Sequence, residues 1–370
     1  MTKPRLLFLT PVEPSARGAG LALRAWANQW ALSKLCEVDT VVLEPDPGWR
    51  RPLGKLGTLI DPLPLELRQA AVAAKGLDWP PGDFDYIFAF RLRLAPLALA
   101  AAARPGGRDA KLILDLDDIE SRLEAGAQGL AGWLRQAKLA RQERRMIARF
   151  DLTLVCSARD RALLERALSG GSIAVAPNIA PPIRAGLPPR RSGPVPRLLF
   201  VGLLHYGPNV EGLIWFCQEV LPALRAALGR PFELAIVGRG AGPAVEALAE
   251  IPEVKLIGEV EETAPWYAEA DLAIVPLQTG GGTRIKILEA FALRCPVVST
   301  SAGAYGLEVS DRQELLMADR PDAFATACTE ILGDPALVQG LTERARDRLG
   351  RDYSPPALLE HMRLALEALG

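Results

Sequence analysis

Residues 276–292, PLQTGGGTRIKILEAFA, follow a short apolar run at 272–275. A buried run that leads through a glycine-rich loop into a helix is typical of a parallel sheet. Glycines let the backbone approach a ligand closely, and the free amides at the start of the helix favour an anion. Arg284 and Lys286 would add two full positive charges there. The stretch therefore predicts a diphosphate site, with an ordinary flexible loop and solvated cations as the alternative.

The same alternation of short apolar runs and helix-compatible stretches extends over the whole chain. In the first half the apolar runs are 6–9, 38–43, 86–90, 112–114 and 152–155, and the pattern restarts at 197–201. Between the two halves, residues 179–196 contain six prolines and two glycines, a density that excludes a helix or a central strand. We therefore predict an α/β protein with one doubly wound domain at 1–185 and a second at 195–354.

The composition narrows the class of protein. The net charge of −1 over 370 residues argues against a dedicated nucleic-acid binder. The five cysteines are scattered and show neither a disulfide framework nor metal-ligand spacing, so we expect a reducing, cytoplasmic setting. Because only two histidines are present, we expect no histidine-based metal site. We find no apolar run long enough to span a membrane. Residues 133–149 form a basic helix, predicted either to touch an anionic membrane or to present a solvated face.

A series of segments between 197 and 310 resembles the donor domain of glycosyltransferase family 4, the glycosyl transferases group 1. They are Phe200-Val201-Gly202, Pro208-Asn209, Ile236 to Gly240, Gly258-Glu259-Val260, Tyr267 to Asp271 and Gly280 to Thr300. The resemblance extends more weakly over the first half. It implies the GT-B fold, in which two Rossmann-like domains face one another across a cleft, with the helix at 355–370 packing back on the first domain.

The resemblance also implies an activity: retaining transfer of a sugar from a nucleotide-diphosphate donor to a hydroxyl acceptor, with no metal or other cofactor. The acceptor would be a glycan, a lipid-linked glycan or a small molecule, bound by the first domain. The implied donor-binding residues are Gly18, Gly20, Gly202, Asn209, Gly238, Arg239, Val260, Gly281, Gly282, Thr283, Arg284, Ile285, Lys286 and Glu289.

This sequence departs from the family pattern at two places. Glu289 matches the glutamate that binds the donor ribose, but Gly281 stands where a first glutamate usually touches the sugar. Residues 203–208 also lack the usual basic pair. We therefore expect Arg284 and Lys286 to supply the phosphate charge and to act in catalysis.

Acidic residues follow the apolar run at 112–114. Asp117 and Asp118 are adjacent, so their side chains are expected to point in different directions, and Asp118 is predicted to orient the acceptor hydroxyl or the sugar. Helix capping or solvation of both is the alternative. Asp115 to Asp117 fits an Asp-x-Asp metal pattern, but it begins inside a buried strand, so we do not assign it a metal.

Near the N-terminus, Gly18 and Gly20 lie in a loop that either approaches the donor or only shapes a turn, and Arg24 is expected to face the cleft. Two other functions stay open from the sequence. One is a nucleotide-sugar epimerase on the same fold, and the other is a catalytically degenerate nucleotide-binding protein.

Overall fold

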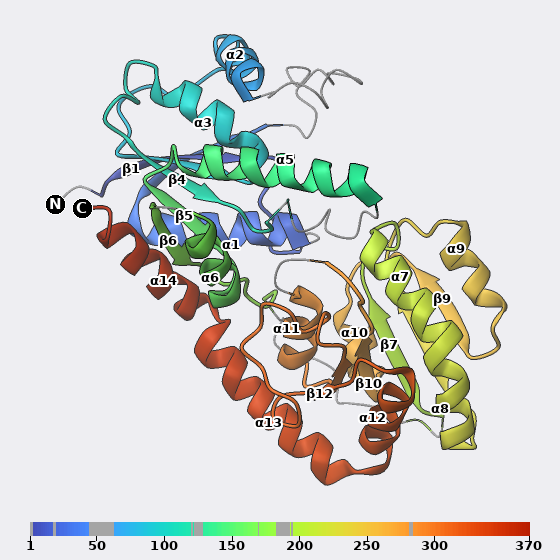
Figure 1. Cartoon of the computed structure of the whole chain (residues 1–370). Coiled ribbons are helices and arrows are strands. Elements are labelled where there is room, and N and C mark those ends of the chain that lie inside the picture. Colours follow the sequence, from blue (N-terminus) through green and yellow to red (C-terminus); the bar gives the residue numbers. More distant parts are fainter. Residues whose placement is uncertain are drawn as a thin grey trace. The chain divides into compact units, whose positions relative to one another are not determined.

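The structure is a computed structural model that describes residues 3–17, 20–43, 63–119, 121, 129–168, 170–182, 193, 195–280 and 284–370 (Figure 1). The chain divides into two compact units. Unit 1 comprises Met1–Ile179 and Pro355–Gly370, and unit 2 comprises Ala180–Ser354. The chain thus leaves unit 1, completes unit 2 and returns to unit 1.

Unit 1 contains a parallel sheet in the order β2-β1-β3-β4-β5-β6. Its strands are β1 (Arg5–Thr10), β2 (Glu37–Val42), β3 (Tyr86–Phe90), β4 (Lys111–Asp115), β5 (Leu152–Val155) and β6 (Ser172–Val175). Its α-helices are α1 (Gly20–Leu35), α2 (Leu63–Ala74), α3 (Ala95–Ala102), α5 (Gly129–Ile147), α6 (Ala158–Ala167) and α14 (Pro355–Glu367).

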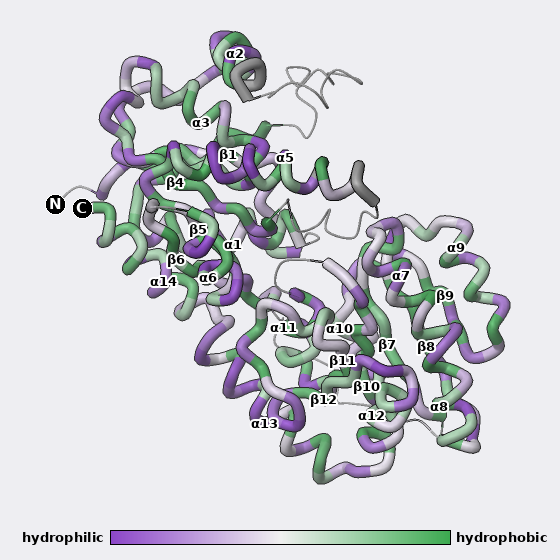
Figure 2. The backbone as a smooth tube through the Cα atoms, viewed as in Figure 1, coloured by the Kyte–Doolittle hydropathy of each residue, from purple (hydrophilic) through white to green (hydrophobic). Residues whose placement is uncertain are grey.

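Helices cover both faces of this sheet, because successive side chains of a strand point to opposite faces. From β1, Leu6 and Phe8 are buried with residues of α1 and α14. Leu7 and Leu9 are buried on the other face with residues of α2, α3 and α5. Both faces of β1 are therefore apolar. Figure 2 shows another strand of the same sheet, β4, in the green of hydrophobic residues.

Unit 2 repeats the plan with a parallel sheet in the order β12-β11-β10-β7-β8-β9. Its strands are β7 (Arg197–Val201), β8 (Glu233–Val237), β9 (Val254–Gly258), β10 (Leu272–Val275), β11 (Val297–Ser299) and β12 (Leu316–Met317). Its α-helices are α7 (Gly207–Trp215), α8 (Leu221–Leu228), α9 (Pro243–Glu246), α10 (Ala264–Glu269), α11 (Ile285–Ala292), α12 (Pro321–Gly333) and α13 (Pro335–Asp352). The expected α/β class with two doubly wound parallel sheets is confirmed.

Each sheet has one place where the strand order reverses. In unit 2, β8 and β9 lie on one side of β7 while β10, β11 and β12 lie on the other, so the switch point is between β7 and β10. In unit 1 it is between β1 and β3. The loops that leave the two strands of a switch point diverge, and ligands of open α/β sheets bind in the crevice that results.

One helix boundary differs from the sequence prediction. The sequence pattern of residues 212–228 predicts a helix, but the helix begins at Gly207, since Pro208 in its first turn needs no amide partner there. A π-helical segment, Phe216–Val220, then separates α7 from α8. The earlier start is functionally important because it places Asn209 in the first turn of a helix.

Candidate donor site and an acidic cluster

The first set of predicted site residues meets at the switch point of unit 2. Gly202 directly follows β7, and α11 begins at Ile285 after the loop that follows β10. The Nζ of Lys286 donates a 2.8 Å hydrogen bond to Oδ1 of Asn209. A Cβ on Gly202 would lie 3.0 Å from that Nζ. The first turns of α7 and α11 are therefore joined by one ammonium group that lies against the end of β7.

The surroundings of Lys286 change its charge. Its Nζ lies 4.3 Å from the centre of the Phe200 ring. Burial, followed by the positive charge of Arg284, lowers the pKa of Lys286 from 10.5 to about 7, against the opposing effect of Glu289. This low pKa reduces the positive charge of Lys286 in the ligand-free protein above pH 7. An anion close to the ammonium would restore that charge.

Arg284 lies beside the same loop. Its side chain is buried, and Nη2 donates a 3.3 Å hydrogen bond to the carbonyl oxygen of Thr279. Gly280 has a φ of +112°, and a Cβ there would lie 2.6 Å from Nη2. The guanidinium therefore packs on its own loop and depends on a glycine at 280. The predicted residues Gly281, Gly282 and Thr283 lie outside the described residues, as does Gly18.

Glu289 is one turn further along α11 from Ile285. Its carboxylate accepts hydrogen bonds from Oγ1 of Thr263 and, at 3.3 Å, from the hydroxyl of Tyr267. Burial raises the pKa of Glu289, while the two hydrogen bonds and Lys286 act in the opposite direction. The sequence analysis missed Thr263 and Tyr267 as partners of this carboxylate. The two hydroxyls hold the carboxylate in a fixed orientation.

The other predicted donor residues of unit 2 gather at the same strand ends. Gly238 has a φ of +155°, and a Cβ there would lie 1.8 Å from the carbonyl oxygen of Gly202. The amide of Gly238 donates to the carbonyl oxygen of Gly258 at 2.8 Å, two residues before Val260. The ends of β7, β8 and β9 are thus adjacent, with Arg239 next to Gly238. Gly20 belongs to unit 1, where it begins α1.

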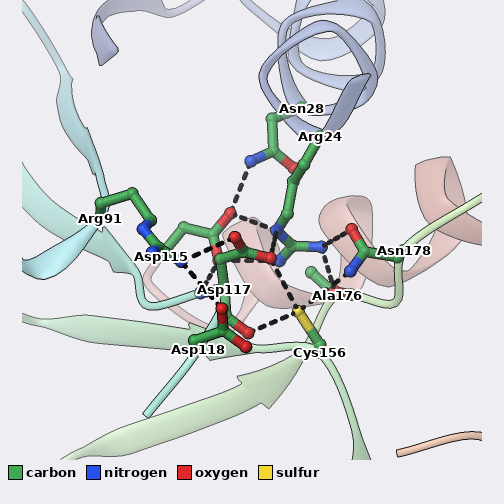
Figure 3. Close-up of polar contacts among 9 residues, drawn as sticks. All are labelled: Arg24, Asn28, Arg91, Asp115, Asp117, Asp118, Cys156, Ala176 and Asn178. Atoms are coloured by element: carbon green, nitrogen blue, oxygen red, sulfur yellow. Dashed lines mark hydrogen bonds and ion pairs between the residues drawn. The ribbon is translucent and has the colours of Figure 1, made fainter. Parts of the chain in front are cut away.

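Unit 1 carries a second polar cluster, shown in Figure 3. Arg24 of α1 is only 2% exposed and pairs with Asp115 at the end of β4, with Nη2–Oδ1 at 2.7 Å and Nε–Oδ2 at 3.0 Å. Asn28 donates to the same carboxylate, while Arg24 also donates to Asn178 at 3.1 Å. The expectation that Arg24 faces a cleft is therefore wrong. A buried guanidinium needs a carboxylate partner, and Asp115 supplies it.

The adjacent carboxylates of this cluster also differ from expectation. Asp117 and Asp118 do not diverge but both approach Nη1 of Arg91, at 2.8 Å and 3.2 Å. Asp117 has a φ of +58°, which turns the backbone so that both carboxylates reach one cation. The sequence analysis missed Arg91. The available signal was a charged residue placed directly after the buried run at 86–90.

Two further properties concern the part of the chain that the structure describes. It contains no group of three or more histidine, cysteine, aspartate or glutamate side chains that could hold a metal ion. Nor does any of its helices combine the length and hydrophobicity needed to cross a membrane.

Comparison with known proteins agrees with this arrangement. Residues 195–334 match the family model described as "Glycosyl transferases group 1". Most of unit 2 is therefore similar to the group 1 glycosyl transferases. A protein of Klebsiella pneumoniae described as an uncharacterized 44.6 kDa protein in a cps region is 29% identical over 136 residues, which is 35% of this chain and 35% of that protein. The match therefore spans about a third of the length of this curated relative.

Solved structures that are similar over the full length show that the chain has the GT-B fold. Sucrose-phosphate synthase from Thermosynechococcus elongatus matches with a TM-score of 0.72 at 17% identity, covering 99% of each chain. The α,α-trehalose 6-phosphate synthase from Burkholderia multivorans matches with a TM-score of 0.68 at 15% identity, covering 100% of this chain and 99% of the other. Anabaena HepE, solved with UDP and glucose, matches with a TM-score of 0.63 at 15% identity, covering 100% of both.

Proposed function

We propose that this glycosyltransferase transfers a sugar from a nucleotide-diphosphate donor to a hydroxyl acceptor with retention of anomeric configuration. The observation that carries the proposal is the convergence of Lys286, Asn209 and Gly202 at the switch point of unit 2, beside the fixed carboxylate of Glu289. An ammonium between two helix starts suits a diphosphate. A carboxylate nearby suits the paired hydroxyls of a ribose. Anabaena HepE, which has a similar fold, was solved with UDP, and this supports a nucleotide as the ligand.

The chemistry follows from these groups. When the sugar leaves, negative charge develops on the departing diphosphate, and Lys286, Arg284 and the amides at the start of α11 stabilise it. The diphosphate itself then accepts the proton of the attacking hydroxyl, so retention needs no nucleophile from the protein. Asp118 orients the hydroxyl. Unit 2 binds the donor and unit 1 the acceptor, and neither a metal nor another cofactor takes part.

A binding panel followed by a transfer assay tests the proposal. We expect one class among UDP-, GDP-, ADP- and dTDP-sugars to raise the melting temperature, since a ligand stabilises the state that binds it. Arg284→Ala should raise the dissociation constant of that donor roughly tenfold to a hundredfold, the value of one charge-assisted hydrogen bond. Arg294→Ala, an arginine at the other end of α11, serves as the matched control. Failure of every donor to bind would refute the function.

The same panel separates the other candidates. An epimerase would convert the sugar while it is still attached to the nucleotide, which chromatography of the nucleotide-sugar detects. A catalytically degenerate protein would bind the donor but release no nucleoside diphosphate with any acceptor. The relative from a cps region supports a glycan acceptor and polysaccharide synthesis as the process.

A peripheral membrane contact at the cytoplasmic side is a further element of the proposal. On α5, Trp133 and Leu134 are 61% and 53% exposed. Four exposed arginines follow on the same helix and its end: Arg141, Arg144, Arg145 and Arg149. Exposed apolar residues beside a basic face suit an anionic lipid surface. Pelleting with phosphatidylserine vesicles, but not with phosphatidylcholine vesicles, is the expected result, and Trp133→Ser should reduce it.

A further inference from the structure

We infer that Arg91 is a positioning residue of the transfer reaction: it holds Asp117 and Asp118 together and thereby presents Asp118 to the reacting hydroxyl. The inference rests on the proposed function and adds a residue to it. Arg91 follows β3 directly, at the switch point between β1 and β3, where an open α/β sheet places its ligands.

Backbone strain is the first observation. Arg91 has a φ of +79° and Asp117 a φ of +58°, and neither is a glycine. Such a conformation is unfavourable for a residue with a Cβ and persists only where the surroundings impose it. Here the two strained residues follow neighbouring strands and are joined to each other by the 2.8 Å ion pair. A contact that served only to join β3 to β4 would need no strain at either end.

The second observation is how rigidly the turn after β4 is held. The amide of Asp117 donates to Oδ1 of Asp115 at 3.1 Å, and Asp115 is itself fixed by Arg24. The thiol of Cys156 donates to the carbonyl oxygen of Asp117 at 3.0 Å. Buried contacts thus fix the backbone of the turn (Figure 3). The carboxylates of Asp117 and Asp118 point toward the guanidinium of Arg91.

The third observation separates the roles of the two carboxylates. One oxygen of Asp117 faces Arg91, and the other lies 3.6 Å from both Nε of Arg24 and Sγ of Cys156. Asp118 uses Oδ2 for Arg91, while its Oδ1 accepts no hydrogen bond from any residue that the structure describes. The side chain of Asp118 is 22% exposed. Asp118 therefore has an oxygen available for a hydroxyl donor, and Asp117 does not.

Charge explains why Arg91 is needed for this arrangement. Burial and the neighbouring Asp118 raise the pKa of Asp117, while Arg91 and Arg24 lower it. Without the guanidinium, two adjacent carboxylates would repel each other and the pair would hold a proton up to a higher pH. Asp118 would then leave its position, or the pair would be neutralised in the range where the enzyme works.

The test uses the nucleotide-sugar that gives the largest thermal shift, with release of nucleoside diphosphate in transfer to water as the readout. We expect Arg91→Met to lower this rate roughly tenfold to a hundredfold, as the loss of a charge-assisted hydrogen bond implies. Donor affinity should stay unchanged, and the acid limb of the pH–rate profile should move to higher pH. Arg161→Met, which removes an exposed ion pair with Glu165 in the same unit, is the control for a general effect.

A double-mutant cycle decides whether Arg91 acts through Asp118. In a protein that already carries Asp118→Asn, Arg91→Met should lower the rate of nucleoside diphosphate release less than threefold. Arg91→Gly, which relieves the positive φ and favours folding, should lose activity like Arg91→Met. Two results would overturn the inference and leave the proposed function intact. One is an equal loss of rate on Arg91→Met with Asp118 present and with Asp118→Asn, and the other is an acid limb of the pH–rate profile that Arg91→Met does not move. Loss of donor binding in the unmodified enzyme would instead refute the proposed function.

Discussion

The lowered pKa of Lys286 makes donor binding a proton-linked reaction. Above pH 7 the ligand-free ammonium is mostly deprotonated, because its pKa is about 7. The donor diphosphate is an anion that does not titrate in this range, and beside it the pKa of Lys286 should return to at least its ordinary value. Binding must therefore take up a proton from the solvent.

The magnitude follows from the pKa. A group with a pKa of about 7 is about one-tenth protonated at pH 8 and about nine-tenths protonated at pH 6. Donor binding should take up about 0.9 proton at pH 8 and about 0.1 proton at pH 6. The dissociation constant should rise about tenfold for each pH unit once the pH exceeds 7. In the ligand-free protein the free energy of unfolding should rise with pH between 7 and 10.5, where the unfolded chain binds the extra proton.

Titration calorimetry in two buffers of different ionisation enthalpy measures the uptake directly. Lys286→Arg should keep binding but lose the proton uptake, since an arginine does not titrate here. Lys255→Arg, an exposed lysine on β9, is the matched control and should leave the uptake unchanged. Uptake near zero at pH 8 in the unmodified enzyme, or uptake that survives Lys286→Arg, would refute the reasoning.

Three further predictions concern other parts of the molecule. Glu289→Gln should abolish the preference for a ribose over a 2′,3′-dideoxyribose nucleotide, measured as a ratio of dissociation constants; a preserved ratio would assign the ribose to another group. Arg24→Met should lower the free energy of unfolding of unit 1 by about 3–5 kcal/mol in urea, because it leaves Asp115 charged and buried. The double variant Arg24→Met/Asp115→Leu should recover most of that loss, and no recovery would contradict the ion-pair argument. Met362→Ala on α14, which is 1% exposed, should cost about 2–5 kcal/mol in the same assay, and a cost near zero would mean that α14 is not part of the core of unit 1.

The strands and helices could be predicted from the sequence because each of them is marked by a pattern of neighbouring residues. Apolar runs that alternate with helical stretches predict parallel strands. The chain passes from unit 1 to unit 2 between Ile179 and Ala180, at the start of the proline-rich stretch 179–196. Residues 272–292 likewise predicted a strand followed by a helix, in the order observed.

The site contacts were less predictable because they join distant residues. Lys286 and Asn209 are 77 positions apart, and only the strand order brings them together. Arg24 gave no sign of burial, since its partner Asp115 is 91 positions away. For Arg91 the one signal was its place directly after the run at 86–90, since a positive φ at a non-glycine residue leaves no pattern in the sequence.

The return of the chain to unit 1 has a consequence for biosynthesis. Leu358 and Met362 of α14 are buried with Ala25 and Leu32 of α1, so the core of unit 1 includes residues from both ends of the described chain. A ribosome delivers Ala180–Ser354 before α14 emerges, although domains generally fold in the order in which they are made. Unit 2 therefore emerges while α1 still exposes the apolar face that α14 covers, and unit 1, begun first, is completed last.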